Sequence, residues 1–127
     1  MEWIWKAISV NSEDFDSRNL LAELLMLHVE YTQNSLSAKY LEQAKNQLSQ
    51  SIRINPKFAK THALMADMKL IEYLNVRNSG AKAELLEDAR KHYLYSFELN
   101  AKLRSQYGAQ LKRVESLLEK SNSQSRN

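Results

Sequence analysis

Glycine and proline are nearly absent from this chain, and their scarcity limits the folds that it can adopt. Among its 127 residues, only Gly80, Gly108 and Pro56 are of these two types. A β-sandwich, a dinucleotide-binding fold or a P-loop needs more glycine for its turns and phosphate loops. Cysteine is absent, which excludes disulfides and cysteine nucleophiles. The hydrophobic share of 43% and the charged share of 26% are typical of a folded domain.

Apolar residues recur at three- and four-residue spacing along most of the chain, which predicts an all-α protein without a sheet. The apolar stripes cover residues 20–29, 40–52, 58–74, 85–100 and 103–118. Pro56 should end the second helix at Asn55 and lie in the first turn of the third, and Gly80 should help to end that third helix. With a further helix over residues 1–13, we expect about six helices. Residues 121–127 contain no apolar residue and are expected to be disordered.

The chain also contains an internal repeat, in which residues 44–57 align with residues 89–102 at an offset of 45. The pairs in register are Ala44 with Ala89, Leu48 with Tyr93, Ser51 with Ser96 and Asn55 with Asn100. Leu21-Ala22 matches Met65-Ala66 at an offset of 44. The expected units are the second helix of a truncated repeat over 1–13, repeats over 14–57 and 58–100, a capping helix over 101–120 and the tail over 121–127. Such helix pairs would stack into a right-handed array.

This pattern resembles the tetratricopeptide repeat (TPR) family. The second helix of that family's repeat carries an alanine, a large apolar residue, a small residue and a closing proline, matched here by Ala44, Leu48, Ser51 and Pro56. The next repeat departs from the pattern, with Ala101 in place of the proline. The period of 44–45 residues exceeds the family's usual length, which indicates lengthened helices. HEAT repeats have a similar period and remain an alternative, although the Asn-Pro closure favours the TPR reading.

The resemblance implies a right-handed superhelix of antiparallel helix pairs that binds a peptide or helix of another protein in its concave groove. The first helix of each pair would line this groove. The expected lining residues are Asn19, Glu23, Met26, Lys60, Ala63, Asp67, Leu70 and Lys112. Glu23 and Asp67 would favour a partner with basic or hydrogen-bond-donating groups. Asn19 and Glu23 stand where the family's clamp for C-terminal carboxylates has a lysine and an asparagine, so no such clamp is expected.

Three other hypotheses remain open. Because the first repeat is truncated, the chain could be a fragment of a longer array, excised from a bacterial signalling protein such as a protein kinase or a transcription regulator. Alternatively, the basic pair Lys112-Arg113 with Tyr107 could bind RNA through the last helix. Self-association through Trp3 and Trp5 of the N-terminal helix is the third hypothesis.

Catalytic and metal-binding patterns are absent from the sequence, so we expect neither an enzyme nor a cofactor. The histidines, His28, His62 and His92, have no zinc-ligand spacing, and His62 lies on an apolar face, where a core role is expected. The longest apolar stretch is interrupted by Glu23 and His28, so no membrane span is predicted. The N-terminus lacks the pattern of a signal peptide, which makes a cytoplasmic location the expectation.

Overall fold

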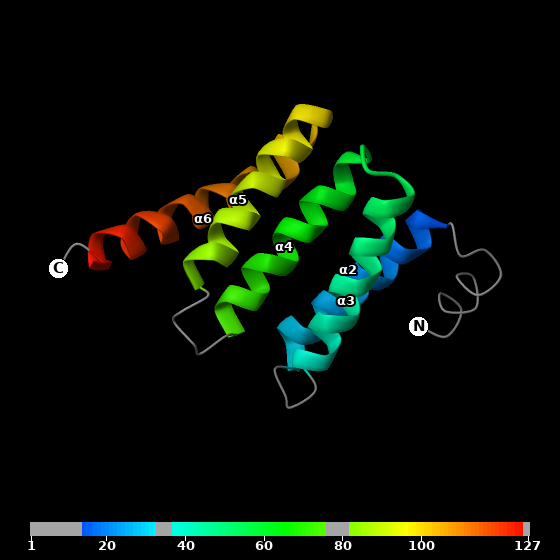
Figure 1. Cartoon of the computed structure of the whole chain (residues 1–127), viewed down its shortest axis with the longest axis horizontal. Helices are drawn as coiled ribbons and strands as arrows, with labels where there is room; N and C mark the ends of the chain where they lie inside the picture. Colours follow the sequence, from blue (N-terminus) through cyan, green and yellow to red (C-terminus); the bar gives the residue numbers. More distant parts are fainter. Residues whose placement is uncertain (1–13, 33–36, 76–81, 126–127) are drawn as a thin grey trace.

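The computed structural model shows an all-α chain and describes residues 14–32, 37–75 and 82–125. Its helices are α2 (Phe15–Thr32), α3 (Ser37–Ile54), α4 (Ala59–Asn75), α5 (Lys82–Leu99) and α6 (Leu103–Ser125) (Figure 1). Within these ranges there is no strand, as the periodicity predicts. The helix expected over 1–13, with Trp3 and Trp5, and the break at Gly80 lie outside the described residues. The expected count of six helices therefore stays a prediction.

A capping interaction starts α2. The carboxylate of Asp14 accepts hydrogen bonds from the backbone N–H of Ser17 at 3.1 Å and from its hydroxyl at 2.7 Å. These bonds favour the ionised carboxylate and lower the pKa of Asp14 below its usual value. A short acidic side chain such as that of Asp14 can satisfy N–H groups that have no partner inside the helix.

Pro56 ends α3 as predicted, but it does not lie in the first turn of α4. It follows Asn55 in a β-turn closed by the N–H of Phe58, which donates to the carbonyl oxygen of Asn55 at 3.4 Å. Proline is favoured at the second position of such a turn because its ring fixes φ there. The helix α4 then begins at Ala59. Pro56 therefore lies in the turn before α4, and the prediction that it lies in the first turn of that helix was wrong.

The same turn recurs 45 residues later, where Ala101 replaces the proline. The N–H of Leu103 donates to the carbonyl oxygen of Asn100 at 3.1 Å, and the N–H of Asn100 bonds Ser96 just as that of Asn55 bonds Ser51, each at 2.9 Å. The aligned small and large residues are also equivalent in burial. Ala44, Leu48 and Ser51, like Ala89, Tyr93 and Ser96, are all completely buried. The sequence repeat is thus a structural repeat.

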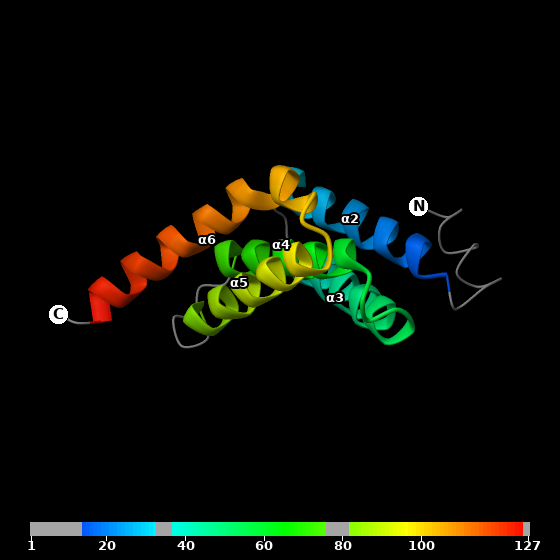
Figure 2. The same cartoon turned by 90° about the horizontal axis from the view of Figure 1, so that it is seen from above.

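The helices α2 and α3 form one antiparallel pair, α4 and α5 form a second, and α6 packs against α5 and α4. Seen from above, α2 and α6 lie on one side of the molecule and α3 and α5 on the other, with α4 between them (Figure 2). Within the described part of the chain, α4 contacts each of the other four helices. It therefore contributes to both hydrophobic cores, one with α2 and α3 and the other with α5 and α6.

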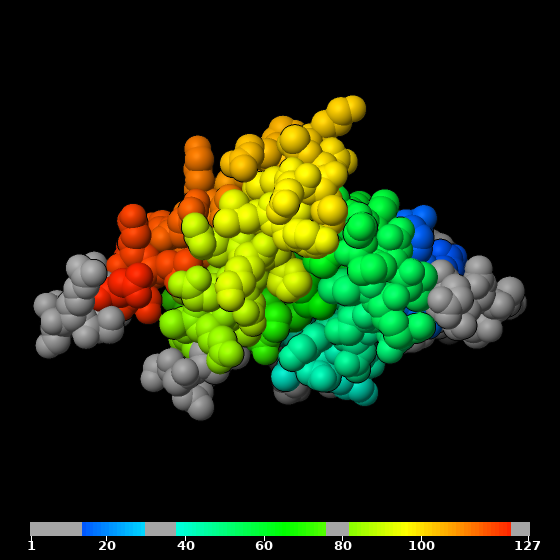
Figure 3. Space-filling view, turned by 45° about the horizontal axis from the view of Figure 1, so that its top comes forward, coloured from blue at the N-terminus to red at the C-terminus, as the bar shows by residue number. Residues whose placement is uncertain are grey.

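The last helix runs further than the sequence pattern predicted. It continues to Ser125, whereas we expected the capping helix to end at Lys120 and the tail to be disordered. The C-terminal part of α6 extends beyond α5 at the left of the molecule (Figure 3). Among the side chains described up to Asn122, Leu118 is the last strongly buried one.

Candidate partner-binding groove

Three helices enclose a cavity of about 220 Å³ on one side of the molecule. These helices are α2, α4 and α6, the first helix of each pair and the unpaired last helix. The lining residues are Glu23, Met26, Leu27, Leu64, Asp67, Ile71, Gln106, Tyr107 and Gln110. The lining thus combines aliphatic side chains with two carboxylates, and no basic residue is among them.

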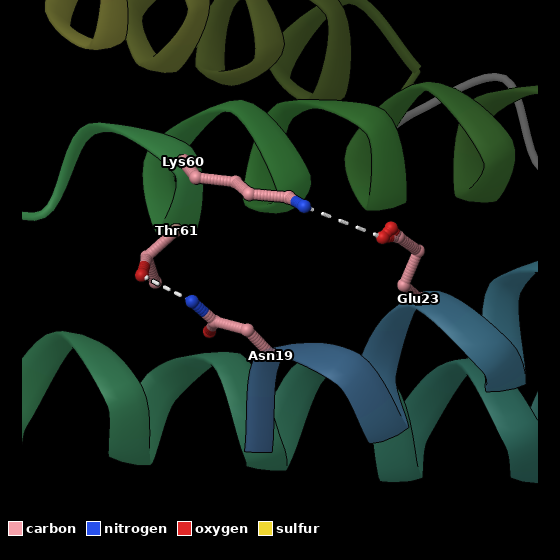
Figure 4. Close-up of polar contacts among 4 residues, drawn as sticks. All are labelled: Asn19, Glu23, Lys60 and Thr61. Atoms are coloured by element: carbon pink, nitrogen blue, oxygen red, sulfur yellow. Dashed lines mark hydrogen bonds and ion pairs between the residues drawn. The ribbon is translucent and has the colours of Figure 1, made fainter. Parts of the chain in front are cut away.

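A second cavity of about 260 Å³ lies along α2, toward its N-terminal end. It is lined by Asp16, Asn19, Leu20, Glu23, Phe58 and Lys60. Glu23 lines both cavities, and we call the two together the α2 groove. The Nζ atom of Lys60 lies 3.7 Å from the Glu23 carboxylate across this groove (Figure 4). Both side chains are partly exposed, so this ion pair contributes little to stability.

Asp67 is anchored at the floor of the groove by a buried tyrosine. The hydroxyl of Tyr93 on α5 donates a short hydrogen bond to the Asp67 carboxylate. Burial raises the pKa of Tyr93 well above its ordinary value, and the negative charge of Asp67 adds to this effect. Tyr93 therefore stays protonated at neutral pH and serves as a hydrogen-bond donor.

Tyr107 forms the α6 wall of the first cavity. Burial, together with the nearby charges of Asp67 and Glu23, raises the pKa of Tyr107 to about 12. Its ring centroid lies 6.4 Å from that of Tyr93, and the residue is only 4% exposed. This burial contradicts the hypothesis that Tyr107 stacks on a nucleic-acid base, because an occupied ring face offers no platform.

Asn19 lines the second cavity, but its side chain is mostly buried between α2 and α4. Its Nδ2 donates to the Thr61 hydroxyl at 2.8 Å and so joins α2 to α4 (Figure 4). Its Oδ1 is buried and has no hydrogen-bond partner among the described residues. Since the residue is 4% exposed, it offers little surface to a partner, and its main contact is the bond to Thr61.

The sequence prediction identified only some of the α4 residues that line the groove, and the others are off by one position in the sequence. Lys60 and Asp67 line the groove as expected, but Ala63 and Leu70 do not. Ala63 is fully buried and Leu70 is 5% exposed, and both belong to the core shared with α5 and α6. The expected exposure of these two residues was therefore wrong. The neighbouring residues Leu64 and Ile71 take their places, because a shift of one residue turns the position by about 100° around the helix.

The remaining expected residues divide between the groove and other surfaces. Glu23 and Met26 line the first cavity, although Met26 is mostly buried. Lys112 is exposed on α6 but lines neither cavity, which corrects the expectation for that residue. Gln106 and Gln110, which do face the groove, were missed. Their four-residue spacing, with Tyr107 between them, is the pattern that could have identified this face of α6.

The described residues contain neither a cluster of metal ligands nor a helix that could span a membrane. Across residues 14–32, 37–75 and 82–125, no three histidine or carboxylate side chains converge as ligands. None of the helices in those same ranges has both the length and the apolar composition needed to cross a membrane. Comparisons with protein-family models, with curated proteins and with solved structures find no match to this chain.

Proposed function

We propose that this chain is a non-catalytic protein–protein interaction module of the TPR type, which binds a peptide or helix of a partner protein in the α2 groove. The observation that supports this function is the position of the groove. It lies between α2, α4 and α6, which correspond to the first helices of successive repeats. The resemblance to TPR proteins implies a binding groove lined by these same helices.

Exposed leucines at the groove further support this proposal. Leu27 is 43% exposed and lines the first cavity, and Leu20 is 39% exposed and lines the second. Exposed aliphatic side chains beside a hollow can be covered by the apolar face of a bound helix. The two leucines lie seven residues apart on α2, so they share one face of the helix.

The test compares two leucines of similar exposure on different faces. Leu27→Arg places a charge in the groove, whereas Leu94→Arg places the same charge on α5, where Leu94 is 36% exposed and lines neither cavity. Partners captured from lysate of the source cells by the immobilised chain would be identified and quantified by mass spectrometry. We expect Leu27→Arg to lose a protein that both the wild type and Leu94→Arg retain. Equal retention by both variants would contradict the groove assignment.

A further inference from the structure

We infer that residues 1–13 of this chain pack antiparallel on α2 and cover Leu20 and Leu24, in the way that α3 packs on α4 and α5 packs on α6. This segment lies outside the described residues, and it is joined directly to Asp14, which caps α2. The inference goes beyond the proposed function and does not depend on it, because it concerns a contact within the chain itself.

The first argument is that exposed leucines on α2 occupy positions that are buried on α4. The two helices begin 44 residues apart, at Phe15 and Ala59. The same offset pairs Leu20 with Leu64 and Leu24 with Met68. Leu64 and Met68 are buried in the core with α2 and α3, the pair of helices that precedes α4. Leu20, in contrast, is 39% exposed, and Leu24 is only partly buried. This face of α2 therefore corresponds to one that a preceding helix covers.

The second argument is that residues 1–13 carry the sequence pattern of a helix that packs on this face. Ile4, Ala7, Ile8 and Asn11 match Leu48, Ser51, Ile52 and Asn55 at the offset of 44, and Tyr93, Ser96, Phe97 and Asn100 at an offset of 89.

Ile4 therefore occupies the position of Leu48 and Tyr93, which are both completely buried. Leu48 belongs to the same core as Leu64, the equivalent of Leu20. Tyr93 packs near Tyr107 of the helix that follows it, with 6.4 Å between the ring centroids. By the same arrangement, we expect Ile4 to pack against Leu20.

The length of the segment limits how far along α2 it reaches. Asn55 and Asn100 each lie in the turn before the next helix, and Asn11 occupies the same position in the repeat. Residues 1–10, as a helix, would span about 15 Å. Measured from the start of α2, this length extends past Leu24 but not to Leu27, which lies about 18 Å along the helix. The segment would thus cover Leu20 and leave Leu27 and the first cavity open to a partner.

The experiment uses the absence of cysteine from the chain. Two double variants of the full chain, Ile4→Cys with Leu20→Cys and Ile4→Cys with Leu27→Cys, are reduced and then oxidised with glutathione disulfide. A disulfide forms readily only where the two Cα atoms come within about 7 Å of each other, so we expect the Leu20 pair to close about tenfold faster than the Leu27 pair. Mass spectrometry measures the closed fraction over time, and non-reducing electrophoresis distinguishes a bond within one molecule from a bond between two.

The Leu27 pair is the matched control, because Leu20 and Leu27 are similarly exposed and share one face of α2. If residues 1–13 made no contact with α2, the longer loop to Leu27 would slow closure only about twofold. Closure rates that differ by no more than this factor, or slow closure of both pairs, would overturn the inference. Disulfides between two molecules would also overturn it, because a second copy would then cover Leu20. The capture experiment with Leu27→Arg needs no contact from residues 1–13, so it tests the proposed function separately.

Discussion

The Nδ1 atoms of His62 on α4 and His92 on α5 lie 3.2 Å apart, and the two rings stack nearly parallel with their centroids 5.4 Å apart. The Nε2 of His62 lies 2.8 Å from the carbonyl oxygen of Pro56, which can only accept a hydrogen bond. In the neutral state, His62 must therefore carry its proton on Nε2, and His92 donates its Nδ1–H to His62. One hydrogen-bonded chain thus links the turn before α4 to α5. His62 is 7% exposed, which confirms the core role expected from the sequence.

This arrangement predicts that the protein loses stability as the pH falls below about 6.5. Burial lowers the pKa of His92 below its ordinary value, the neighbouring His62 and Lys69 lower it further, and Asp88 opposes them. Below the ordinary value of 6.5, the unfolded chain therefore binds a proton that the folded chain does not yet bind. The stabilising effect of the neutral His92 is complete above that pH, and it is lost as the pH falls toward the lowered pKa of His92 in the folded state. Urea denaturation between pH 8 and pH 5 measures this slope, and His92→Gln should flatten it. An identical slope in the variant would contradict the assignment to His92.

Removal of the Tyr93 hydroxyl should destabilise the fold. Tyr93→Phe keeps the ring but leaves the Asp67 carboxylate without its donor from α5. A hydrogen bond to a charged group contributes about 1.5–3 kcal/mol, and we expect a loss of that order in the free energy of unfolding. Tyr95→Phe, at a residue that is 37% exposed, is the matched control and should change it by less than about 0.5 kcal/mol. Equal effects of the two variants in urea denaturation would disagree with this prediction.

The hydrogen bond between Asn19 and Thr61 should make the effects of substitutions at these two residues on the free energy of unfolding non-additive. Thr61→Val alone deprives the Nδ2 of the buried Asn19 amide of its hydrogen-bond acceptor and should cost about 1–3 kcal/mol of unfolding free energy. Asn19→Leu combined with Thr61→Val removes both polar groups, and we expect the double variant to be more stable than Thr61→Val. A double variant as unstable as the sum of the two single variants would argue against direct coupling.

The two cores should unfold together because α4 contributes to both. Leu21→Ala affects the core with α2 and α3, and Leu86→Ala affects the core with α5 and α6; both leucines are fully buried. We expect each substitution to cost about 2–5 kcal/mol and to leave a single unfolding transition. Leu74→Ala, at a residue 49% exposed, should cost much less. Two separate transitions in either core variant, seen by circular dichroism, would show that the cores are independent.

Gly108 lies inside α6, where its backbone freedom serves no visible purpose. A Cβ atom built there would meet only Arg104 Cγ at 3.8 Å, an ordinary van der Waals contact. Gly108→Ala should therefore raise the free energy of unfolding by roughly 0.5–1 kcal/mol, because glycine loses more backbone entropy in a helix than alanine. A fall in the thermal midpoint of unfolding would contradict this prediction, because it would mean that the added methyl group clashes with a neighbour.

The sequence by itself determined the helical class, the ends of most helices and the register of the repeat. These features depend on local chemistry, such as the cap at Asp14, the proline after Asn55 and the recurrence of Ala44 and Ala89 in register. The cap and the proline can be read within one or two turns of helix, and the repeat can be read by comparing two segments of the sequence 45 residues apart. The same local reasoning was wrong at the polar end of α6, where the sequence predicts a disordered tail but the helix continues to Ser125.

Only the tertiary structure decided which residues face the groove. The helix α2 carries leucines around most of its circumference, so its periodicity does not separate the exposed Leu27 from the buried Leu25. On α4, apolar residues occupy both the groove stripe and the second core, and the choice between Ala63 and Leu64 depends on the rotation of α4 against four neighbours. Such a rotation is set by how all the side chains pack together, which no single helix encodes.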